Sequence, residues 1–332
     1  QEAYYGELDV ENLGLVSVAH LDTYAGLIFA TWAEDAPTLE DNLGDMRFYI
    51  DTLFNRRDGG MHFLGPEKWI IPNNWKVSTD NFIGDQYHAP LSHRSATITM
   101  AKAMGTKMDF SYNNYKSSGF EIAAGNGHGL GMRFAKDQDE LWEFYKTFAL
   151  DPRLMEYTRS INSEISERLG PTRANQLFNA NGSIFPNLSF LWVICTVRLW
   201  HPRGPDKVEV WSFGGIENSA SPEIQEVWRK MCGMTFGPAG LLEQDDMDNW
   251  RSTTQAGKSP TARLTSQDLT MGLRHETKHP VLPGTVVPKF FAEVAQRGLY
   301  SRWQEFMLAN SWKDISVAPP SVALEGRASF KG

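Results

Sequence analysis

Cysteine is scarce in this sequence, and its scarcity excludes several classes of site. The chain of 332 residues contains 2 cysteines, Cys195 in an apolar strand-like run and Cys232 in a helix-like run. Two cysteines cannot form the disulfide framework of a small secreted domain. They also cannot supply the ligands of a cysteine-based zinc or iron–sulfur site. We therefore predict that both are buried thiols.

Long apolar runs and an excess of positive charge are missing as well. The sequence has no uninterrupted apolar stretch long enough for a membrane-spanning helix. No charged-then-apolar leader opens it, which argues against secretion and makes the cytoplasm the expected location. The chain has 32 basic and 40 acidic residues, a net charge of −8 and no basic stripe. Nucleic acid is therefore not an expected partner.

The residues that are abundant indicate a folded enzyme body. Hydrophobic residues make up 41% of the chain and aromatic residues 12%, and a chain of this length can bury a large core. Aromatic and β-branched segments predict strands at 68–71, 108–112, 119–123, 131–134, 189–200 and 208–213. Helical spacing of apolar residues predicts helices at 39–56, 140–169 (with or without a break at Pro152), 222–234 and 288–306. Strands in the middle of the chain with helices around them predict an α+β fold on an antiparallel sheet.

Two histidines and an aspartate lie close together in the first third of the chain. Asp85 and His88 are three residues apart and would share one face of a helix, whereas His93, five residues further, needs a bend or a helix end to converge. Pro90 can supply that bend. Two imidazoles and one carboxylate are the ligand set of non-haem Fe(II) sites. A histidine pair near a bend is also compatible with simple packing.

These residues lie in a segment that resembles a known family. The run Asn81-Phe-Ile-Gly-Asp-Gln-Tyr-His-Ala-Pro-Leu-Ser-His93 is similar to the ferrous-site segment of the large (alpha) subunits of Rieske-type aromatic-ring-hydroxylating dioxygenases, of the naphthalene and polycyclic-arene kind. A second run, Phe236-Gly-Pro-Ala-Gly-Leu-Leu-Glu-Gln-Asp-Asp246, resembles the stretch in which that family places its carboxylate ligand. The similarity covers nearly the whole chain. It implies that His88, His93 and Asp246 ligate Fe(II).

The resemblance also implies roles for two neighbours of the metal. In the family, the residue at Asp85 bridges an iron-side histidine and a cluster-ligating histidine of a neighbouring subunit, which gives an electron path between subunits. The residue at Asn81 lies near the metal in the family. A helix N-cap is the alternative role for Asn81.

The resemblance further implies a chiefly apolar substrate pocket, since a flat arene binds by burying its faces. Its matching positions are Phe82, Ala89, Leu191, Phe236 and Leu242. Leu242 stands where the naphthalene enzymes have an aromatic residue, and Ala89 is small, so a larger polycyclic or biaryl substrate is favoured. Arg198 is a candidate partner for a carboxylated arene, unless strand alternation points it outward.

The reaction that the resemblance implies is the cis-dihydroxylation of an aromatic substrate with O2 at mononuclear Fe(II). The electrons would come from a ferredoxin and an NADH-dependent reductase through a [2Fe–2S] Rieske cluster. The implied assembly is an alpha trimer, with or without small beta subunits (α3β3). The implied fold is the helix-grip, START-like catalytic domain. A Rieske-type monooxygenase or demethylase on the same scaffold is the alternative within this class.

One part of the family pattern is absent from this sequence. A Rieske cluster takes two cysteine and two histidine ligands, and no Cys-x-His with a later Cys-x-x-His occurs here. Residues 1–38, with expected strands at 15–19 and 26–32, are interpreted as the C-terminal remnant of the Rieske domain and its connection. Residues 39–332 are interpreted as the catalytic mononuclear-iron domain. The cluster is thus expected in the full-length subunit, on ligands outside this chain.

A rival motif points to a different class of enzyme. The run His275-Glu-Thr-Lys-His279 matches the His-Glu-x-x-His signature of zinc metallopeptidases. That mechanism requires both histidines and Glu276 on an intact helix. Pro280 disfavours helical geometry at the residue before it, so we predict a solvated loop. The zinc peptidase is one alternative function, and a non-catalytic carrier of hydrophobic ligands is another.

A glycine-rich run at 125–131 invites comparison with phosphate-binding loops. It lacks the Gly-Lys-Ser/Thr ending and is followed by a strand-like segment instead of a helix. We predict a hairpin or a flexible loop there.

Overall fold

An antiparallel sheet of eight strands forms the centre of the molecule. This computed structural model describes residues 2–103, 119–148, 151–192 and 194–321. From one edge of the sheet to the other, the strands are β10 (Thr285–Val287), β4 (Gly119–Gly125), β5 (His128–Phe134), β6 (Leu177–Ile184), β7 (Leu188–Leu191), β8 (Thr196–Pro202), β9 (Val208–Glu217) and β3 (Met61–Ile71). Each strand pairs antiparallel with its neighbours. The expected α+β class with an antiparallel sheet is confirmed.

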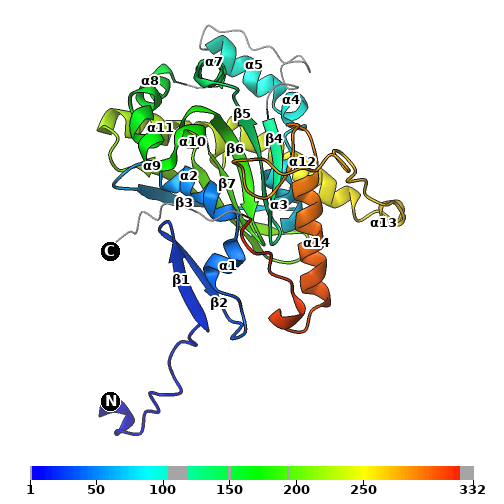
Figure 1. The fold of residues 1–332 in the computed structure, drawn as a ribbon. Helices are drawn as coiled ribbons and strands as arrows, with labels where there is room; N and C mark the ends of the chain where they lie inside the picture. The colour runs from blue at the N-terminus through cyan, green and yellow to red at the C-terminus, as the bar shows by residue number, and fades with distance from the viewer. Residues whose placement is uncertain (1, 104–118, 149–150, 193, 322–332) are drawn as a thin grey trace.

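Helices cover both faces of this sheet (Figure 1). One face carries α3 (Trp75–Gly84), α12 (Leu241–Ala256) and α14 (Val294–Leu308), and the other carries α2 (Met46–Phe54). Helix α11 (Pro222–Phe236) packs beside α12 and against β9, where Cys232 faces Gly214. Side chains alternate between the two faces along each strand. In β5, Leu130 and Met132 join the larger apolar core together with residues of α2. Gly129, which directly precedes Leu130, faces α14 so closely that an added Cβ would lie 2.7 Å from the side chain of Ala295.

Apolar clusters hold the helices on the sheet, and two of them lie nearest the site. The larger connects α2 and α11 with strands of the sheet, and its members include Tyr49, Ile50, Leu53, Ile122, Leu130, Phe190, Val197, Trp228 and Met231. The smaller lies beneath α3 and α12 and comprises Ile71, Phe82, Trp200, Val208, Val210 and Trp250. Its three aromatic rings have centroids 5.4 to 6.2 Å apart in edge or tilted contacts, which add directional preference to the burial of apolar area. Both α3 and α12 therefore rest on one aromatic cluster.

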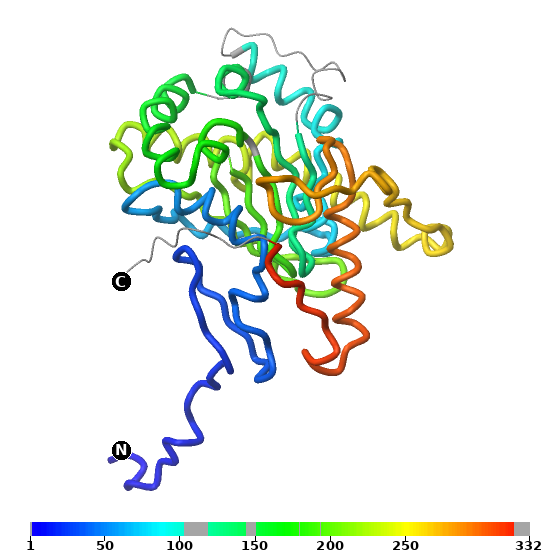
Figure 2. Tube along the Cα trace, in the orientation of Figure 1, coloured from blue at the N-terminus to red at the C-terminus, as the bar shows by residue number. Residues whose placement is uncertain are grey.

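The remaining elements are short. They are the helices α1 (Leu39–Leu43), α4 (Ala89–Ser92), α5 (Arg94–Ala103), α7 (Gln138–Phe148), α8 (Pro152–Ser160), α9 (Asn162–Leu169), α10 (Pro171–Asn175) and α13 (Pro260–Leu264), and the 3-10 turns η1 (Glu2–Tyr4) and η2 (Trp312–Asp314). A separate hairpin of β1 (His20–Tyr24) and β2 (Leu27–Thr31) extends beneath the sheet, with the N-terminus beyond it (Figure 2). The Tyr24 hydroxyl donates to Asp51 of α2 at 3.1 Å, which ties the hairpin to the body.

The predicted helix 222–234 is confirmed as α11, whereas the other three predicted helices are divided or begin later. The predicted helix 39–56 is split into α1 and α2, because Gly44 adopts φ 48 between them, a conformation that glycine reaches without steric cost. The predicted helix 140–169 is three helices, and Asp151 caps the second by accepting from the backbone N–H of Arg153. The predicted helix 288–306 begins at Val294, because the preceding residues pack as a loop in which Phe290 and Ala292 are buried.

One predicted strand is absent, and another is divided into two. Residues 15–19 form no strand; Leu15 and Val16 are exposed, and the first strand begins at His20. The segment 189–200 is two strands, with Cys195 at φ 54 in the turn between them. Both cysteines are free and buried, as predicted. The predicted strand 108–112 lies outside the described residues.

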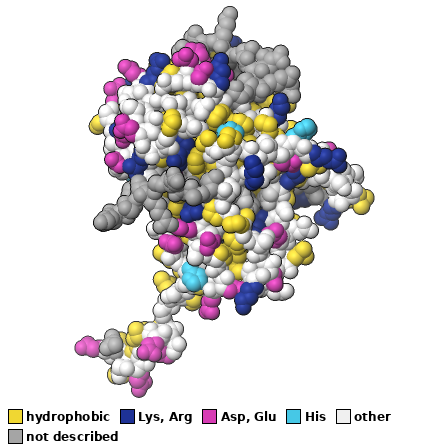
Figure 3. Space-filling model, in the orientation of Figure 1, with side chains coloured by type: hydrophobic (Ala, Val, Ile, Leu, Met, Phe, Trp, Pro, Cys, Tyr) yellow, Lys and Arg dark blue, Asp and Glu magenta, His cyan; other side chains and the backbone are white. Residues whose placement is uncertain are grey.

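The surface carries charges of both signs. On the face seen in Figure 3, lysine and arginine side chains are interspersed with aspartate and glutamate. Among the helices that the structure describes, none has the length and apolar character needed to cross a membrane.

Candidate metal centre

A one-turn helix separates the two histidines. After α3, Asp85 turns the chain with φ −70 and ψ 85. His88 is the N-cap of α4, Pro90 lies in its first turn and His93 is its C-cap. Pro90 therefore begins a short helix, where its missing N–H costs nothing, and does not bend a longer one. The two imidazoles converge from the two ends of α4.

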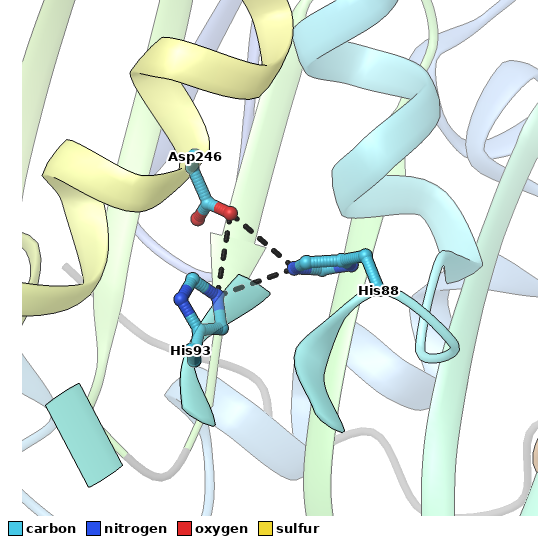
Figure 4. Close-up of side chains that lie close together, drawn as sticks. All are labelled: His88, His93 and Asp246. Atoms are coloured by element: carbon cyan, nitrogen blue, oxygen red, sulfur yellow. Dashed lines mark hydrogen bonds and ion pairs between the residues drawn. The ribbon is translucent and has the colours of Figure 1, made fainter. Parts of the chain in front are cut away.

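Asp246 completes a triangle of donor atoms with the two histidines (Figure 4). Nε2 of His88 and Nε2 of His93 are 3.2 Å apart. Each of them lies 3.3 Å from Oδ1 of Asp246, which comes from α12. His93 and Asp246 are buried, and His88 is partly buried. The structure thus brings together the three residues predicted as ligands.

The triangle has the size that a metal ion requires. Donor atoms about 2.1 Å from one ion are separated by about 3.0 Å at octahedral angles and by about 3.4 Å at tetrahedral angles. The observed sides fall between these values. Oδ1 of Asp246 is buried and accepts no hydrogen bond from the described residues, an arrangement that is costly unless a cation faces the oxygen. In the described part of the chain, this is the one cluster of three His, Cys, Asp or Glu side chains that could hold an ion.

Outer contacts determine how the imidazoles face the triangle. Nδ1 of His88 lies 2.7 Å from the backbone carbonyl of Asp85, and Nδ1 of His93 lies 3.2 Å from Oδ2 of Asp245. These acceptors assign the proton to each Nδ1, so both Nε2 lone pairs point to the common centre. Sequence reasoning did not assign a role to Asp245, although a carboxylate next to a ligand on the same helix is a usable signal.

Asp85 and Asn81 contact His88 from the end of α3. Oδ1 of Asp85 accepts from the backbone N–H of His88 at 3.1 Å. Nδ2 of Asn81 lies 3.2 Å from Oδ2 of Asp85 and 3.2 Å from Nδ1 of His88. The alternative role of Asn81 as a helix N-cap is wrong, because Asn74 caps α3 by accepting from the backbone N–H of Lys76.

The charges around the triangle favour an ionised carboxylate. Burial alone raises the pKa of Asp246, but the neighbouring imidazoles outweigh burial and hold this pKa well below its usual value. Burial lowers the pKa of His88 and of His93, and the surrounding carboxylates outweigh it and raise both pKa values. A divalent cation in the triangle would replace those protons, so its binding releases protons.

A buried ion pair lies beside the ligand helix. Arg198 of β8 and Glu243 of α12 are both 0% exposed, with Nη1 and Oε2 2.6 Å apart. Nη2 of Arg198 also donates to the carbonyl of Phe236 at 2.7 Å. Burial raises the pKa of Glu243 to about 7, although Arg198 opposes this shift. The alternative in which Arg198 points outward is therefore wrong. Its charge is neutralised by Glu243, a partner that sequence reasoning did not find.

The predicted pocket residues lie on the elements that surround the triangle. Phe82 belongs to the smaller cluster, Leu191 at the end of β7 contacts both clusters, and Phe236 and Leu242 belong to the larger one. Ala89 begins α4 directly after His88. Their role in lining a substrate pocket stays a prediction.

The rival motif does not form the helix that a zinc peptidase needs. Residues 275–279 are a loop, in which Thr277 makes a single bridge to Val286. Glu276 pairs with Arg297 at 2.6 Å, and Nδ1 of His279 accepts from the backbone N–H of Leu282 at 3.0 Å. The predicted loop is confirmed. The glycine-rich run 125–131 forms the β4–β5 hairpin, as predicted.

Comparison with known proteins gives consistent results. The family model described as "Ring hydroxylating alpha subunit (catalytic domain)" matches residues 39–309. Biphenyl 2,3-dioxygenase subunit alpha of Rhodococcus jostii (strain RHA1) is 36% identical over 312 residues, which cover 92% of this chain and 66% of that protein. Biphenyl dioxygenase subunit alpha of Metapseudomonas furukawaii is 37% identical over 304 residues, which cover 90% of this chain and 64% of that protein. The chain thus spans slightly less than two thirds of the length of these relatives.

Solved structures show the same fold. Naphthalene 1,2-dioxygenase with indole bound in the active site superposes with a TM-score of 0.81 at 27% identity, over 94% of this chain and 69% of that one. Naphthalene 1,2-dioxygenase from Rhodococcus sp. bound to indole superposes with a TM-score of 0.77 at 32% identity, over 93% of this chain and 71% of that one.

Proposed function

The chain belongs to the ring hydroxylating alpha subunit family, in its catalytic domain, and from this premise we propose that it catalyses cis-dihydroxylation of an aromatic hydrocarbon with O2. The observation that carries the proposal is the triangle of Nε2, Nε2 and Oδ1 atoms with sides of 3.2 to 3.3 Å. Two neutral imidazoles and one carboxylate are the facial ligand set of non-haem Fe(II) oxygenases. This set leaves adjacent coordination positions open, and bound Fe(II) supplies the site at which O2 is activated beside the substrate.

The residues of this chain have distinct tasks in that reaction. His88, His93 and Asp246 hold the ion, and the acceptors at both Nδ1 atoms keep the imidazoles oriented. Asp85 contacts His88 from the side opposite the triangle, through Nδ1. That position suits the bridging role that the family resemblance implies, in which electrons arrive from a Rieske [2Fe–2S] cluster of a neighbouring subunit. Asn81 donates to the carboxylate of Asp85 and so steadies that side chain.

The partners follow from the same premise. The chain would act within a longer alpha subunit that carries the cluster, in an alpha trimer with or without small beta subunits. A ferredoxin and an NADH-dependent reductase would supply the electrons. The proposed division places the catalytic domain at residues 39–332 and the end of the Rieske domain at residues 1–38.

The substrate is proposed to be an uncharged biaryl or polycyclic arene. Relatives at 36% and 37% identity are named biphenyl dioxygenases, and the solved neighbours are naphthalene dioxygenases. Leu242 and Ala89 are smaller than the flat aromatic side chains that would narrow a pocket, which favours the larger rings. Arg198 is paired with Glu243 and fully buried, so it does not favour a carboxylated arene. Phe82, Leu191 and Phe236 would supply further apolar lining.

Oxygen labelling tests the proposal directly. The full-length subunit, supplied with its electron-transfer partners and 18O2, is incubated with biphenyl or naphthalene, and the product is analysed by mass spectrometry. We expect a cis-dihydrodiol that contains two 18O atoms. A product with a single 18O atom would instead identify a monooxygenase, and the absence of any oxidised product from a panel of arenes would reject the dioxygenase function.

A further inference from the structure

One buried ion pair spans the turn that leads into the ligand helix. Arg198 contacts the chain on both sides of that turn: it donates to the carbonyl of Phe236, the last residue of α11, and it pairs with Glu243 in the first turn of α12. Building on the function proposed above, we propose that Arg198 and Glu243 are a positioning pair that fixes the start of α12 and thereby the carboxylate of Asp246.

The start of α12 has no side-chain cap of its own. Its N-cap residue is Gly240, which has no side chain to accept from the first N–H groups. Gly240 also approaches the end of α11 so closely that an added Cβ would lie 2.3 Å from the carbonyl of Thr235. The turn is therefore tight, and the side-chain contact of Glu243 with Arg198 secures the first turn of α12 against the sheet.

Two anchors on one side of α12 enclose the ligand. Trp250 packs against Trp200 of β8, with ring centroids 5.4 Å apart. Glu243 contacts Arg198, which lies two residues before Trp200 on the same strand and so on the same face of the sheet. Asp246 is three residues after Glu243 and four before Trp250, a spacing that puts all three on one helix face. Loss of the contact between Glu243 and Arg198 would free the half of α12 that carries Asp246, while Trp250 would still hold the other half.

The surroundings of the pair leave it little freedom. The guanidinium carbon of Arg198 lies 5.0 Å from the ring centroid of Phe82 and 5.4 Å from that of Phe236. At these distances the aromatic rings attract the cation. A buried ion pair of this kind contributes little net stability compared with apolar side chains of similar volume. We therefore explain the pair by its effect on the position of Asp246, because residues that orient a metal ligand govern the metal affinity.

Metal affinity is the decisive measurement, because a purely structural pair would leave it unchanged. Co(II) is titrated into the metal-free full-length subunit and its dissociation constant is determined by equilibrium dialysis. In the variant Arg198→Met/Glu243→Met, apolar side chains replace both partners. We expect its Co(II) affinity to fall about 10- to 100-fold. Glu243→Gln keeps an acceptor oxygen for Arg198 but removes the charge, so it should bind Co(II) more weakly than the wild type and more tightly than Arg198→Met/Glu243→Met.

A second buried ion pair provides the matched control. Arg56 and Glu217 form a pair with side chains 6% and 1% exposed, next to Tyr157 and Trp228 and outside the contacts of α12. The variant Arg56→Met/Glu217→Met should bind Co(II) with wild-type affinity. An equal loss in this control, or unchanged affinity in Arg198→Met/Glu243→Met, would overturn the positioning role.

Two single variants keep the test decisive. If Arg198→Met/Glu243→Met does not fold, the affinity of Glu243→Gln is judged against the same control, and a wild-type value rejects the proposal. His88→Ala distinguishes this failure from failure of the proposed function. If His88→Ala binds Co(II) as tightly as the wild type, the triangle is not the metal site, and both proposals fall. If His88→Ala abolishes binding while the pair variants bind normally, the positioning role alone is rejected.

Discussion

Asp85 contacts His88 through two kinds of oxygen, and they have different consequences for a substitution. Its backbone carbonyl lies 2.7 Å from Nδ1 of His88, whereas its carboxylate accepts from the backbone N–H of His88 at 3.1 Å. Asp85→Asn keeps the carbonyl and so keeps the imidazole oriented. We predict that this variant retains Fe(II), as measured by metal content, and loses at least about tenfold in turnover, because the charged bridge for electron transfer is gone.

Asp80 offers a control on the same helix. Its carboxyl accepts from the Tyr300 hydroxyl at 2.7 Å, away from His88. Burial raises the pKa of Asp80 to about 7, so a neutral asparagine there alters the charge little. Asp80→Asn should keep normal turnover. Wild-type coupled turnover in Asp85→Asn would refute the bridging role.

At the residue scale, the sequence alone indicated candidates where partners are close in the chain. The spacing of His88 and His93 with Pro90 between them suggested a pair of ligands, although the same spacing is compatible with simple packing. Asp246 could be named only through the family resemblance, since nothing local distinguishes it from Asp245. The pairing of Arg198 with Glu243 could not be predicted, because strand alternation gives the parity of a residue and not which face lies inward.

His128 joins three elements and makes their packing depend on pH. Its Nε2 donates to the carbonyl of Asn42 in α1 at 2.8 Å, and its Nδ1 accepts from the backbone N–H of Phe185 after β6 at 2.9 Å. A protonated ring would direct two N–H groups at each other at the second contact. Burial, with some help from Arg302, lowers the pKa of His128 to about 4. The folded state therefore requires the neutral ring.

The sign of the effect follows from that lowered pKa. Above pH 6.5 the imidazole is neutral in both states, and between pH 6.5 and 4 the unfolded chain binds a proton that the folded chain does not. His128 should therefore lower the free energy of unfolding by up to about 3 kcal/mol as the pH falls through this range. Burial raises the pKa of Asp80 to about 7 and of Glu121 to about 8, and these groups act in the opposite direction. Urea unfolding of wild type and His128→Gln isolates the histidine; parallel curves from pH 6.5 to 4 would contradict the prediction.

At the element scale, the sequence predicted which segments are helices or strands better than where they break. Gly44 divides the first helix because its φ is positive, and a single glycine in a helical pattern does not reveal that in advance. The turn at Cys195 is harder still, since a cysteine in an apolar run carries no turn signal. In the segment 288–293, Phe290 and Ala292 are buried in a loop by contacts with β4 and β5, and such contacts are not visible in local spacing.

The metal triangle ties together parts of the molecule that are far apart in the chain. His93, for example, contacts Asp245, which lies next to the ligand Asp246 and 152 residues further along the chain. The smaller aromatic cluster joins α3, which leads to the two histidines, with α12. Long-range convergence of this kind cannot be read from composition or periodicity. The fold class could be predicted, because strands and helices have local patterns, whereas the assembly of the triangle required either a known family or coordinates.

A bound ion should therefore stabilise the whole molecule. A ligand that binds only the folded state raises the free energy of unfolding by about 2.7 kcal/mol at a free concentration of 100 times Kd. We predict this shift when Fe(II) is added anaerobically to the metal-free protein, measured by urea unfolding, and its reversal by a chelator.

His88→Ala should abolish the shift, because it removes one corner of the triangle. His275→Ala should retain it, because His275 is exposed in a loop. A shift with Zn(II) that is lost in His275→Ala and kept in His88→Ala would favour the peptidase. No shift with either ion would favour a carrier without a metal, because a carrier needs no cation to hold α4 and α12 together.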